Sequence, residues 1–303
     1  MVTNGGVQHL MKRSRKVSLS LFDCLNVAFM LGIIFIMLYP LYYMAIVSIS
    51  NGGSVSRGEV GFLPVDITWK AYEIVFTDAP IVQAFWNTLL YTTVGVAINL
   101  TMTCLCAYPL SRKSFHGRNV FAMLIVFTMF FDGGLIPKYL LIDSLGMINT
   151  IWAIVLPPSI SIMYMVMMRT FFQEIPEALH ESAYIDGAND WTVFRKVVLP
   201  LSVPLMATMT LFYAVGHWNS FFSALVYLND RSKYPLQIIL RSIVVEGDTS
   251  NQATEMSGIS GSLIISQNIK YAVVIIAILP ILLLYPFLQK YFVKGAMVGS
   301  LKG

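Results

Sequence analysis

A polar segment, residues 181–201, interrupts an otherwise lipid-like sequence and reads ESAYIDGANDWTVFRKVVLPL. Its two carboxylates, Glu181 and Asp186, can accept hydrogen bonds and ion pairs from basic or N–H groups. Two small residues beside them, Ala183 and Gly187, leave room for close approach of another surface. This mixture of charged, small and apolar residues indicates a surface that binds a protein partner.

Two short helices are predicted to position these residues. Residues 177–186 contain no strong helix breaker, and Gly187 can adopt the positive φ that suits a helix C-terminus. Asn189 or Asp190 can cap a second helix by accepting a backbone N–H bond. Apolar residues of that second helix recur at helical spacing, namely Trp191, Phe194 and Val198. Pro200 is expected to end it.

The composition predicts a polytopic all-α membrane protein. Hydrophobic residues make up 56% of the 303 residues and charged residues 12%, against about 25% charged in soluble domains. The mean hydropathy is +0.70. The net charge of +4 does not indicate a nucleic-acid partner, because the basic residues lie in short clusters beside apolar runs. The cysteines Cys24, Cys104 and Cys106 all fall in apolar segments and are expected to be buried packing residues.

Six membrane spans are predicted from runs of residues without charge. Five of them lie at about 21–48, 85–110, 149–172, 203–228 and 271–289. The third span, within 119–142, is interrupted by Asp132, Gly133, Gly134 and Pro137. It is still counted as a crossing, because the fourth span must start outside for the polar segment to lie inside.

The connections between spans are predicted to differ on the two sides. Residues 52–80 should form an external loop with a short interfacial helix near 69–76, and residues 229–270 a long external segment. Of the 20 Lys and Arg residues, 13 fall on the side assigned to the cytoplasm and 7 on the other. The predicted organisation is a cytoplasmic segment 1–20, a membrane domain 21–290 containing the cytoplasmic loop 173–201, and a cytoplasmic tail 291–303.

The polar segment resembles the cytoplasmic coupling loop of permease subunits from ATP-binding-cassette (ABC) importers. That loop has an E-A-A triplet, a Gly four residues later and an apolar-Leu-Pro end. The matching residues here are Glu181, Ser182, Ala183, Gly187, Leu199 and Pro200, with Ser182 in place of the middle Ala. The tail, residues 285–303, looks like the ending of maltose-type sugar permeases. Within that group the sequence is most similar to the branch that handles oligosaccharides.

The resemblance implies a permease subunit in the cell membrane that has no catalytic residue, metal or cofactor of its own. The implied partners are a second permease subunit, a dimer of ABC ATPases that binds the ATP, an extracytoplasmic solute-binding protein, membrane lipid and a carbohydrate. The residues implied to couple to the ATPase are Glu181, Ser182, Ala183, Asp186, Gly187, Leu199 and Pro200.

Polar and aromatic residues in the middle of the fifth span form a candidate substrate path. The ring of Trp218 can stack on a sugar, while His217 and Asn219 can donate hydrogen bonds to hydroxyl groups. Hydrogen bonding between helices explains the same cluster equally well. Asp132 is a second candidate, since ionisable residues at membrane depth are often functional, although an interfacial helix breaker is the favoured interpretation.

Other functional classes lack their motifs in this sequence. There is no G-x-x-x-x-G-K-[ST] sequence, so the chain has no phosphate-binding loop for ATP. H-E-x-x-H and G-x-S-x-G are also absent, and the four histidines lack metal-ligand spacing. The alternatives that remain are a stand-alone channel, a secondary carrier for a small solute, or a membrane scaffold without cargo.

Overall fold

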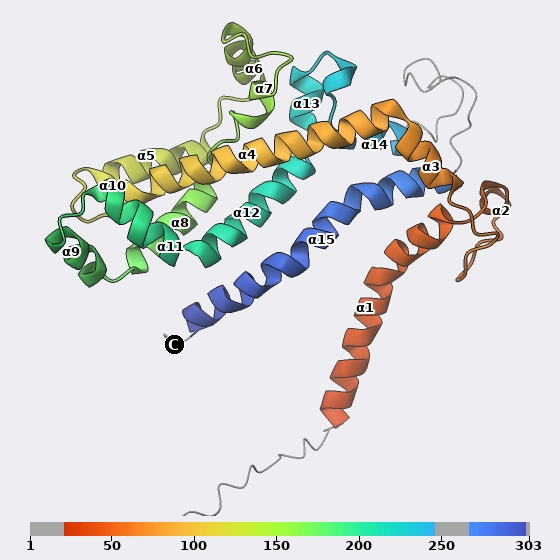
Figure 1. Ribbon diagram of the computed structural model, residues 1–303, viewed down its shortest axis with the longest axis horizontal. Coiled ribbons are helices and arrows are strands. Elements are labelled where there is room, and N and C mark those ends of the chain that lie inside the picture. The colour runs from red at the N-terminus through yellow and green to blue at the C-terminus, as the bar shows by residue number, and fades with distance from the viewer. Residues whose placement is uncertain (1–20, 246–266, 301–303) are drawn as a thin grey trace, which may run out of the picture.

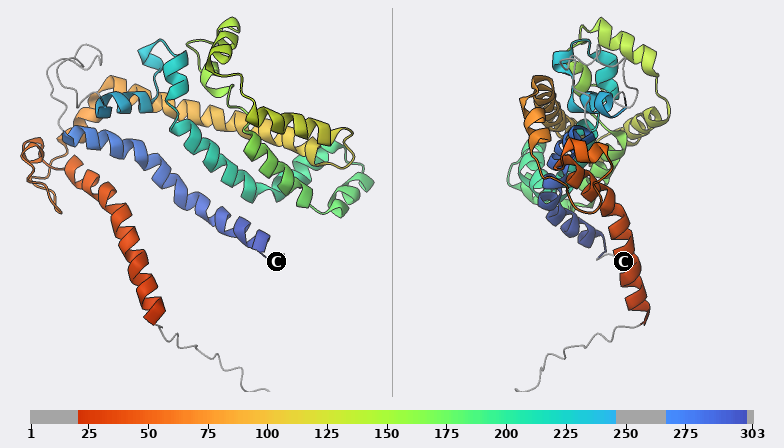
Figure 2. Two further views of the ribbon diagram at one scale, coloured as in Figure 1. Left: turned by 180° about the vertical axis from the view of Figure 1, so that it is seen from behind. Right: turned by 90° about the vertical axis from the view of Figure 1, so that its right-hand side faces the viewer.

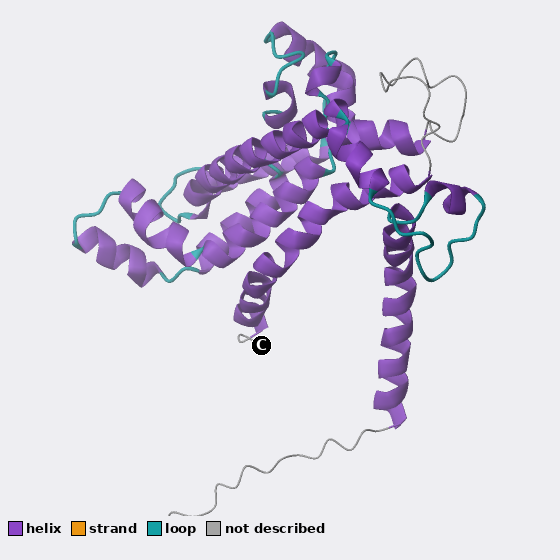
Figure 3. Cartoon of the chain, turned by 45° about the vertical axis from the view of Figure 1, so that its right-hand side comes forward, coloured by secondary structure: helices purple, strands orange, loops and turns teal. Residues whose placement is uncertain are grey.

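The computed structural model describes residues 21–245 and 267–300, and these residues form only helices and loops (Figure 3). The predicted all-α class is confirmed for this part of the chain. The predicted basic segment 1–20, the middle of the predicted external segment at 246–266, and the last three residues lie outside the described residues.

The long helix α4 (Ala79–Ser111) is the axis of the structure (Figure 1). Asp78 caps its first turn by accepting a hydrogen bond from the backbone N–H of Ile81 at 3.2 Å. At about 1.5 Å per residue, its 33 residues span about 50 Å, which exceeds the thickness of a bilayer core. Helices α8 (Ile162–Glu174) and α12 (Val203–Trp218) pack along it.

Helices α15 (Gln267–Ser300) and α1 (Leu21–Ser48) complete the set of long helices. Helix α15 runs beside α12, and α1 contacts α15 near one end but diverges from the rest of the structure (Figures 1 and 2). Most side chains of α1 are therefore exposed, including that of Cys24, which was expected to be buried. Cys104 is buried and Cys106 half-buried.

Within the described residues, three helices, α1, α4 and α15, are long and apolar enough to cross a membrane. The third predicted span is broken, because α5 (Arg118–Phe130) and α6 (Leu135–Ser144) meet at 112°. The Asp132 carboxylate lies at this break. It accepts a hydrogen bond from Gly134 N at 3.0 Å and forms an ion pair with Lys138 Nζ at 2.6 Å.

The fourth and fifth predicted spans are shorter than expected. After α7 (Trp152–Val155) the chain is irregular over residues 156–161 before α8 begins, so the two prolines at 157 and 158 end a helix instead of kinking it. Helix α12 ends at Trp218 and is followed by α13 (Phe222–Tyr227). Charge-free length alone predicts no such interruption, since it treats each apolar run as one helix.

The segments predicted to lie outside contain ordered structure. Helix α3 (Lys70–Thr77) confirms the predicted short helix near 69–76. Helix α14 (Leu236–Val245), which follows the 3₁₀ turn η2 (Arg231–Lys233), was not predicted. It packs on α4 and α15 through apolar residues at helical spacing, namely Leu236, Ile239, Leu240 and Ile243.

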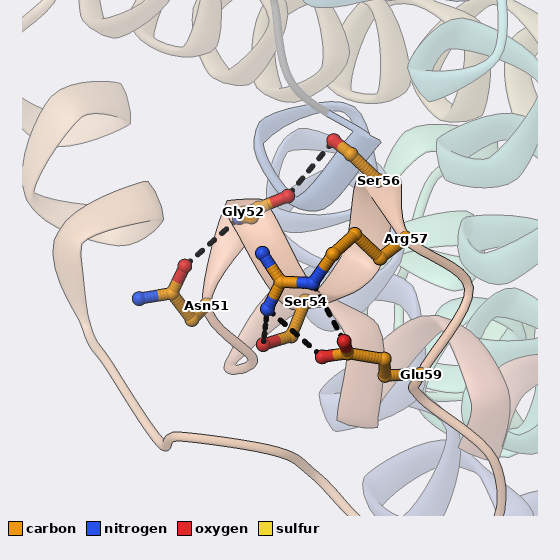
Figure 4. A network of polar contacts seen from close by, with 7 residues as sticks. Asn51, Gly52, Ser54, Ser56, Arg57 and Glu59 are labelled. Carbon is orange, nitrogen blue, oxygen red and sulfur yellow. Dashed lines mark hydrogen bonds and ion pairs between the residues drawn. The ribbon is translucent and has the colours of Figure 1, made fainter.

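The short helix α2 (Gly52–Ser56) is held by local polar contacts (Figure 4). The side chain of Asn51 accepts a hydrogen bond from Gly53 N at 2.8 Å, which caps the helix. At the other end Arg57 donates to Glu59 at 2.6 and 2.9 Å. Both side chains of this ion pair are largely exposed.

A close contact fixes the packing of α4 on α12. Gly95 of α4 is buried, and a Cβ placed there would lie 2.5 Å from His217 Nε2. Only glycine therefore lets the two helices approach with the imidazole between them.

We expect Gly95→Ala to lower the unfolding midpoint of the purified protein in detergent, with an overpacking cost of about 1–3 kcal/mol. Gly216→Ala is the matched control, because nothing lies within 4 Å of a Cβ at Gly216. Adding His217→Ala should make the Gly95→Ala change less costly. Equal midpoints for Gly95→Ala and Gly216→Ala would contradict this packing.

Candidate functional site: a helical hairpin

The polar segment folds as a helical hairpin, defined here as residues 177–201. Helix α9 (Glu177–Ile185) ends in a turn at Gly187, whose φ of +80° confirms the predicted left-handed conformation. The second arm is α10 (Asp190–Val193), the π-helical turn η1 (Phe194–Val198) and α11 (Leu199–Leu201). Figure 1 shows the hairpin at one end of the molecule.

The structure shows where the second arm begins and ends. Asn189 rather than Asp190 is the cap, since its side chain accepts a hydrogen bond from Thr192 N at 2.8 Å. The helix does not end at Pro200 but continues to Leu201, and the chain bends by 79° into α12. Pro200 lies in the first turn of α11, where the missing N–H is tolerated.

The inner face of the hairpin is part of a buried apolar cluster. Val193, Phe194 and Val198 are buried against α4, α8 and α12. The predicted coupling residues Ala183 and Leu199 are half-buried against the same cluster. Because apolar burial stabilises this contact along the whole second arm, the hairpin is fixed to the helices beneath it.

The outer face of the hairpin carries the other predicted coupling residues. Those that are exposed are Glu181, Ser182, Asp186, Gly187 and Pro200. Nothing lies within 4 Å of a Cβ placed on Gly187, so the tip of the turn is open. Sequence reasoning missed one large apolar side chain on this face, Ile185, which is 86% exposed. The position of Ile185 just before the Gly187 turn was the available signal. Trp191, which the predicted helical spacing groups with Phe194 and Val198, is 58% exposed, whereas those two residues are buried.

The fold of the hairpin shifts the pKa values of two of its side chains, Tyr184 and His180. Tyr184 Oη donates a hydrogen bond to Asp190 Oδ1 at 2.5 Å, which joins the two arms and raises the pKa of Tyr184. His180 is buried on the inner face, and burial lowers its pKa so that the neutral imidazole is favoured.

The His217 side chain joins α12 to Asn99 of α4, and Asn99 in turn bonds the break between α7 and α8. Asn99 Nδ2 donates to the Pro158 carbonyl at 2.6 Å, so Asn99 Oδ1 is the atom that faces His217. His217 Nε2 therefore donates to Asn99 Oδ1 at 3.1 Å.

A second polar pair lies one helical turn nearer the hairpin. Thr103 and Tyr213 share a hydrogen bond of 2.7 Å, and Tyr213 Oη accepts one from Ser161 N at 3.1 Å. Thr103 and Tyr213 were not predicted. The two pairs hydrogen-bond backbone groups of the interrupted segment 156–161, as buried polar groups require.

The remaining candidate path residues lie in different surroundings. Trp218 is 4% exposed, donates from Nε1 to the Ala277 carbonyl at 2.9 Å and packs edge-on against Phe85. Asn219 is exposed and accepts a hydrogen bond from Gln237 at 3.4 Å. Asp132 contacts Lys138 and Gly134 and, within the described residues, shares no hydrogen bond with α12. The geometry of His217 and Trp218 favours contacts between helices, and a path role for all four residues stays a prediction.

The hairpin, residues 177–201, lies inside the part of the chain that matches a known family of membrane transport proteins. The chain belongs to the family described as binding-protein-dependent transport system inner membrane component, which matches residues 117–298.

Individual relatives agree with this assignment. The chain is 41% identical over 282 residues to protein LplC of Bacillus subtilis (strain 168), covering 93% of this chain and 95% of that protein. It is also 41% identical over 284 residues to the polygalacturonan/rhamnogalacturonan transport system permease protein YtcP of the same organism, covering 93% and 99%. A solved chain from a bacterial ABC transporter involved in the import of the acidic polysaccharide alginate has a TM-score of 0.82 and 34% identity, covering 91% and 98%.

Trp218→Phe tests whether the indole acts in packing or in transport. The variant keeps a ring against Phe85 but loses the hydrogen bond to Ala277, so we expect a lower unfolding midpoint, by about 1 kcal/mol of stability. The apparent KM for oligosaccharide uptake should not change. A raised KM with an unchanged midpoint would instead indicate that Trp218 contacts the cargo.

Proposed function

We propose that this chain is one of two permease subunits through which an oligosaccharide enters the cell, driven by ATP hydrolysis on a separate ABC ATPase dimer. The hairpin is the observation that carries this proposal. Its inner face is buried in the bundle, and its outer face presents carboxylates, an open glycine turn and exposed apolar side chains.

The outer face of the hairpin suits a cleft on an ATPase. Glu181 and Asp186 can accept bonds from basic or N–H groups, and Ile185 and Trp191 offer apolar area that becomes buried on docking. An open Gly187 lets the turn enter a narrow cleft, because no side chain extends beyond the backbone there.

Six crossings with both ends in the cytoplasm are the proposed topology. The crossings are α1, α4, the bent pair α5–α6, the interrupted pair α7–α8, α12 and α15. In support, α15 runs towards the end of the molecule that carries the hairpin (Figure 1). The exposed apolar surface of α1, which includes Phe29, Phe35 and Ile36, is where the second permease subunit and lipid would pack.

The proposed cargo is an oligosaccharide that carries acidic groups. Two relatives are named for polygalacturonan/rhamnogalacturonan and for the acidic polysaccharide alginate. At the end of α12 away from the hairpin, the exposed Asn219 lies beside Gln237, and the guanidinium of Arg241 lies 5.5 Å from the ring of Phe221. Amide, aromatic and guanidinium groups together can bind the hydroxyls, ring face and carboxylate of a uronic acid. A solute-binding protein would deliver the cargo at this end.

Reconstitution tests the proposal against a channel or secondary carrier. We expect uptake of polygalacturonan oligosaccharides into proteoliposomes only when this chain, a second permease, an ABC ATPase and a binding protein are present with ATP. Uptake by this chain alone, or uptake driven by an ion gradient without ATP, would contradict the proposal.

Gly187→Asp should abolish binding-protein-stimulated ATP hydrolysis while the complex still inserts in the membrane. The added carboxylate meets the ATPase cleft, and the positive φ disfavours a side chain. Gly146→Asp is the matched control, because Gly146 also has positive φ and open space but lies in the α6–α7 turn. Normal stimulation in Gly187→Asp would show that the hairpin does not couple to the ATPase.

A further inference from the structure

The end of α4 meets the start of the hairpin through an ion pair. Arg112 follows the last residue of α4, and its Nη2 donates to Glu177 Oε1, in the first turn of α9, at 2.9 Å. The two residues are 65 positions apart in sequence. The Arg112 side chain is only 13% exposed, so the contact is shielded from solvent on one side. Glu177 is also favourably placed at a helix N-terminus.

Aromatic contacts one turn earlier on α4 reach the other arm of the hairpin. The rings of Tyr108 and Phe194 lie with centroids 4.8 Å apart, and Tyr108 also packs edge-on against Phe172 of α8. Since Tyr184 joins α9 to Asp190, both arms of the hairpin are tied to each other and to the last turns of α4.

A third helix holds the same end of α4. Arg169 of α8 donates from Nε to the Leu110 carbonyl at 3.0 Å. The end of α4 is therefore fixed by directional bonds to α8 and to the hairpin, in addition to the apolar cluster. Apolar packing is non-directional and permits sliding, whereas an ion pair and a backbone hydrogen bond define a register.

We propose that the Arg112–Glu177 ion pair locks the hairpin to α4, so that a displacement of the hairpin by the ATPase moves α4 and not only α11 and α12. Arg112 is thus a positioning residue for transport. This inference rests on the proposed function of the hairpin. It explains why a charged side chain at the end of a long apolar helix is kept largely buried instead of extending into solvent.

The test uses the complete reconstituted transporter with polygalacturonan oligosaccharides as the probe cargo. Arg112→Met removes the charge while retaining an unbranched side chain. We expect stimulated ATP hydrolysis to persist, while cargo transported per ATP falls about ten-fold, as for a coupling free energy of ordinary size. The reversed pair, Arg112→Glu with Glu177→Arg, should recover most of that ratio, because it restores an ion pair between the same two positions.

Arg57→Met is the matched control, because it removes an exposed Arg–Glu pair of similar length just after α2 (Figure 4). Its transport ratio should stay within about two-fold of the unmodified protein, as exposed pairs contribute little. The lock is overturned if Arg112→Met transports a normal amount of cargo per ATP hydrolysed. It is also overturned if the reversed pair folds but does not restore that amount.

The Gly187→Asp variant separates failure of the lock from failure of the proposed function. If it abolishes stimulated hydrolysis while Arg112→Met transports with a normal ratio, only the lock is wrong. If Gly187→Asp hydrolyses and transports normally, the hairpin is not the coupling element and both proposals fall.

Discussion

Apolar packing of the hairpin against the bundle is the interaction on which the rest of the structure depends. Val193, Phe194 and Val198 fill the space between α4, α8 and α12, and each is almost fully buried. Without this contact the hairpin is a loop that moves independently of the helices. With it, the hairpin shares one buried apolar cluster with α4, α8 and α12, and its exposed face lies on the outside of that cluster.

Interrupted helices impose the second constraint. A bilayer offers no water to unpaired backbone groups, so irregular segments need partners within the protein. Asn99 and Tyr213 supply these partners to the backbone of the break at 156–161. Asn99 is also hydrogen-bonded to His217, and Tyr213 to Thr103. The polar residues of α12 therefore support the architecture, whether or not cargo also passes near them.

Local signals made the hairpin predictable from sequence. Gly187 can take positive φ and Asn189 can cap a helix irrespective of distant residues, so both predictions hold. Helix α14 was equally visible, since its apolar residues follow a helical period, but the surrounding Ser, Gly and Asn residues favoured a loop interpretation. In contrast, the partners of His217 come from α4, 118 positions away, and no spacing rule connects them.

Spans three to five show where charge-free length fails as a criterion. The length of a charge-free run shows how many consecutive residues tolerate lipid. Whether those residues form one continuous helix depends instead on their backbone hydrogen bonds. At Asp132 a carboxylate that binds Gly134 N and Lys138 stabilises the break instead of a further turn. In the irregular segment 156–161, the Pro158 carbonyl accepts a hydrogen bond from Asn99 of α4, so the interruption costs little.

The 79° bend at Ser202 determines how force can travel through the chain. Thrust directed along the second arm of the hairpin meets α12 almost broadside, and has little component along the axis of that helix. A force along that arm would act on α12 mainly as a torque, and the end of α12 at Asn219, farthest from the bend, would move the most.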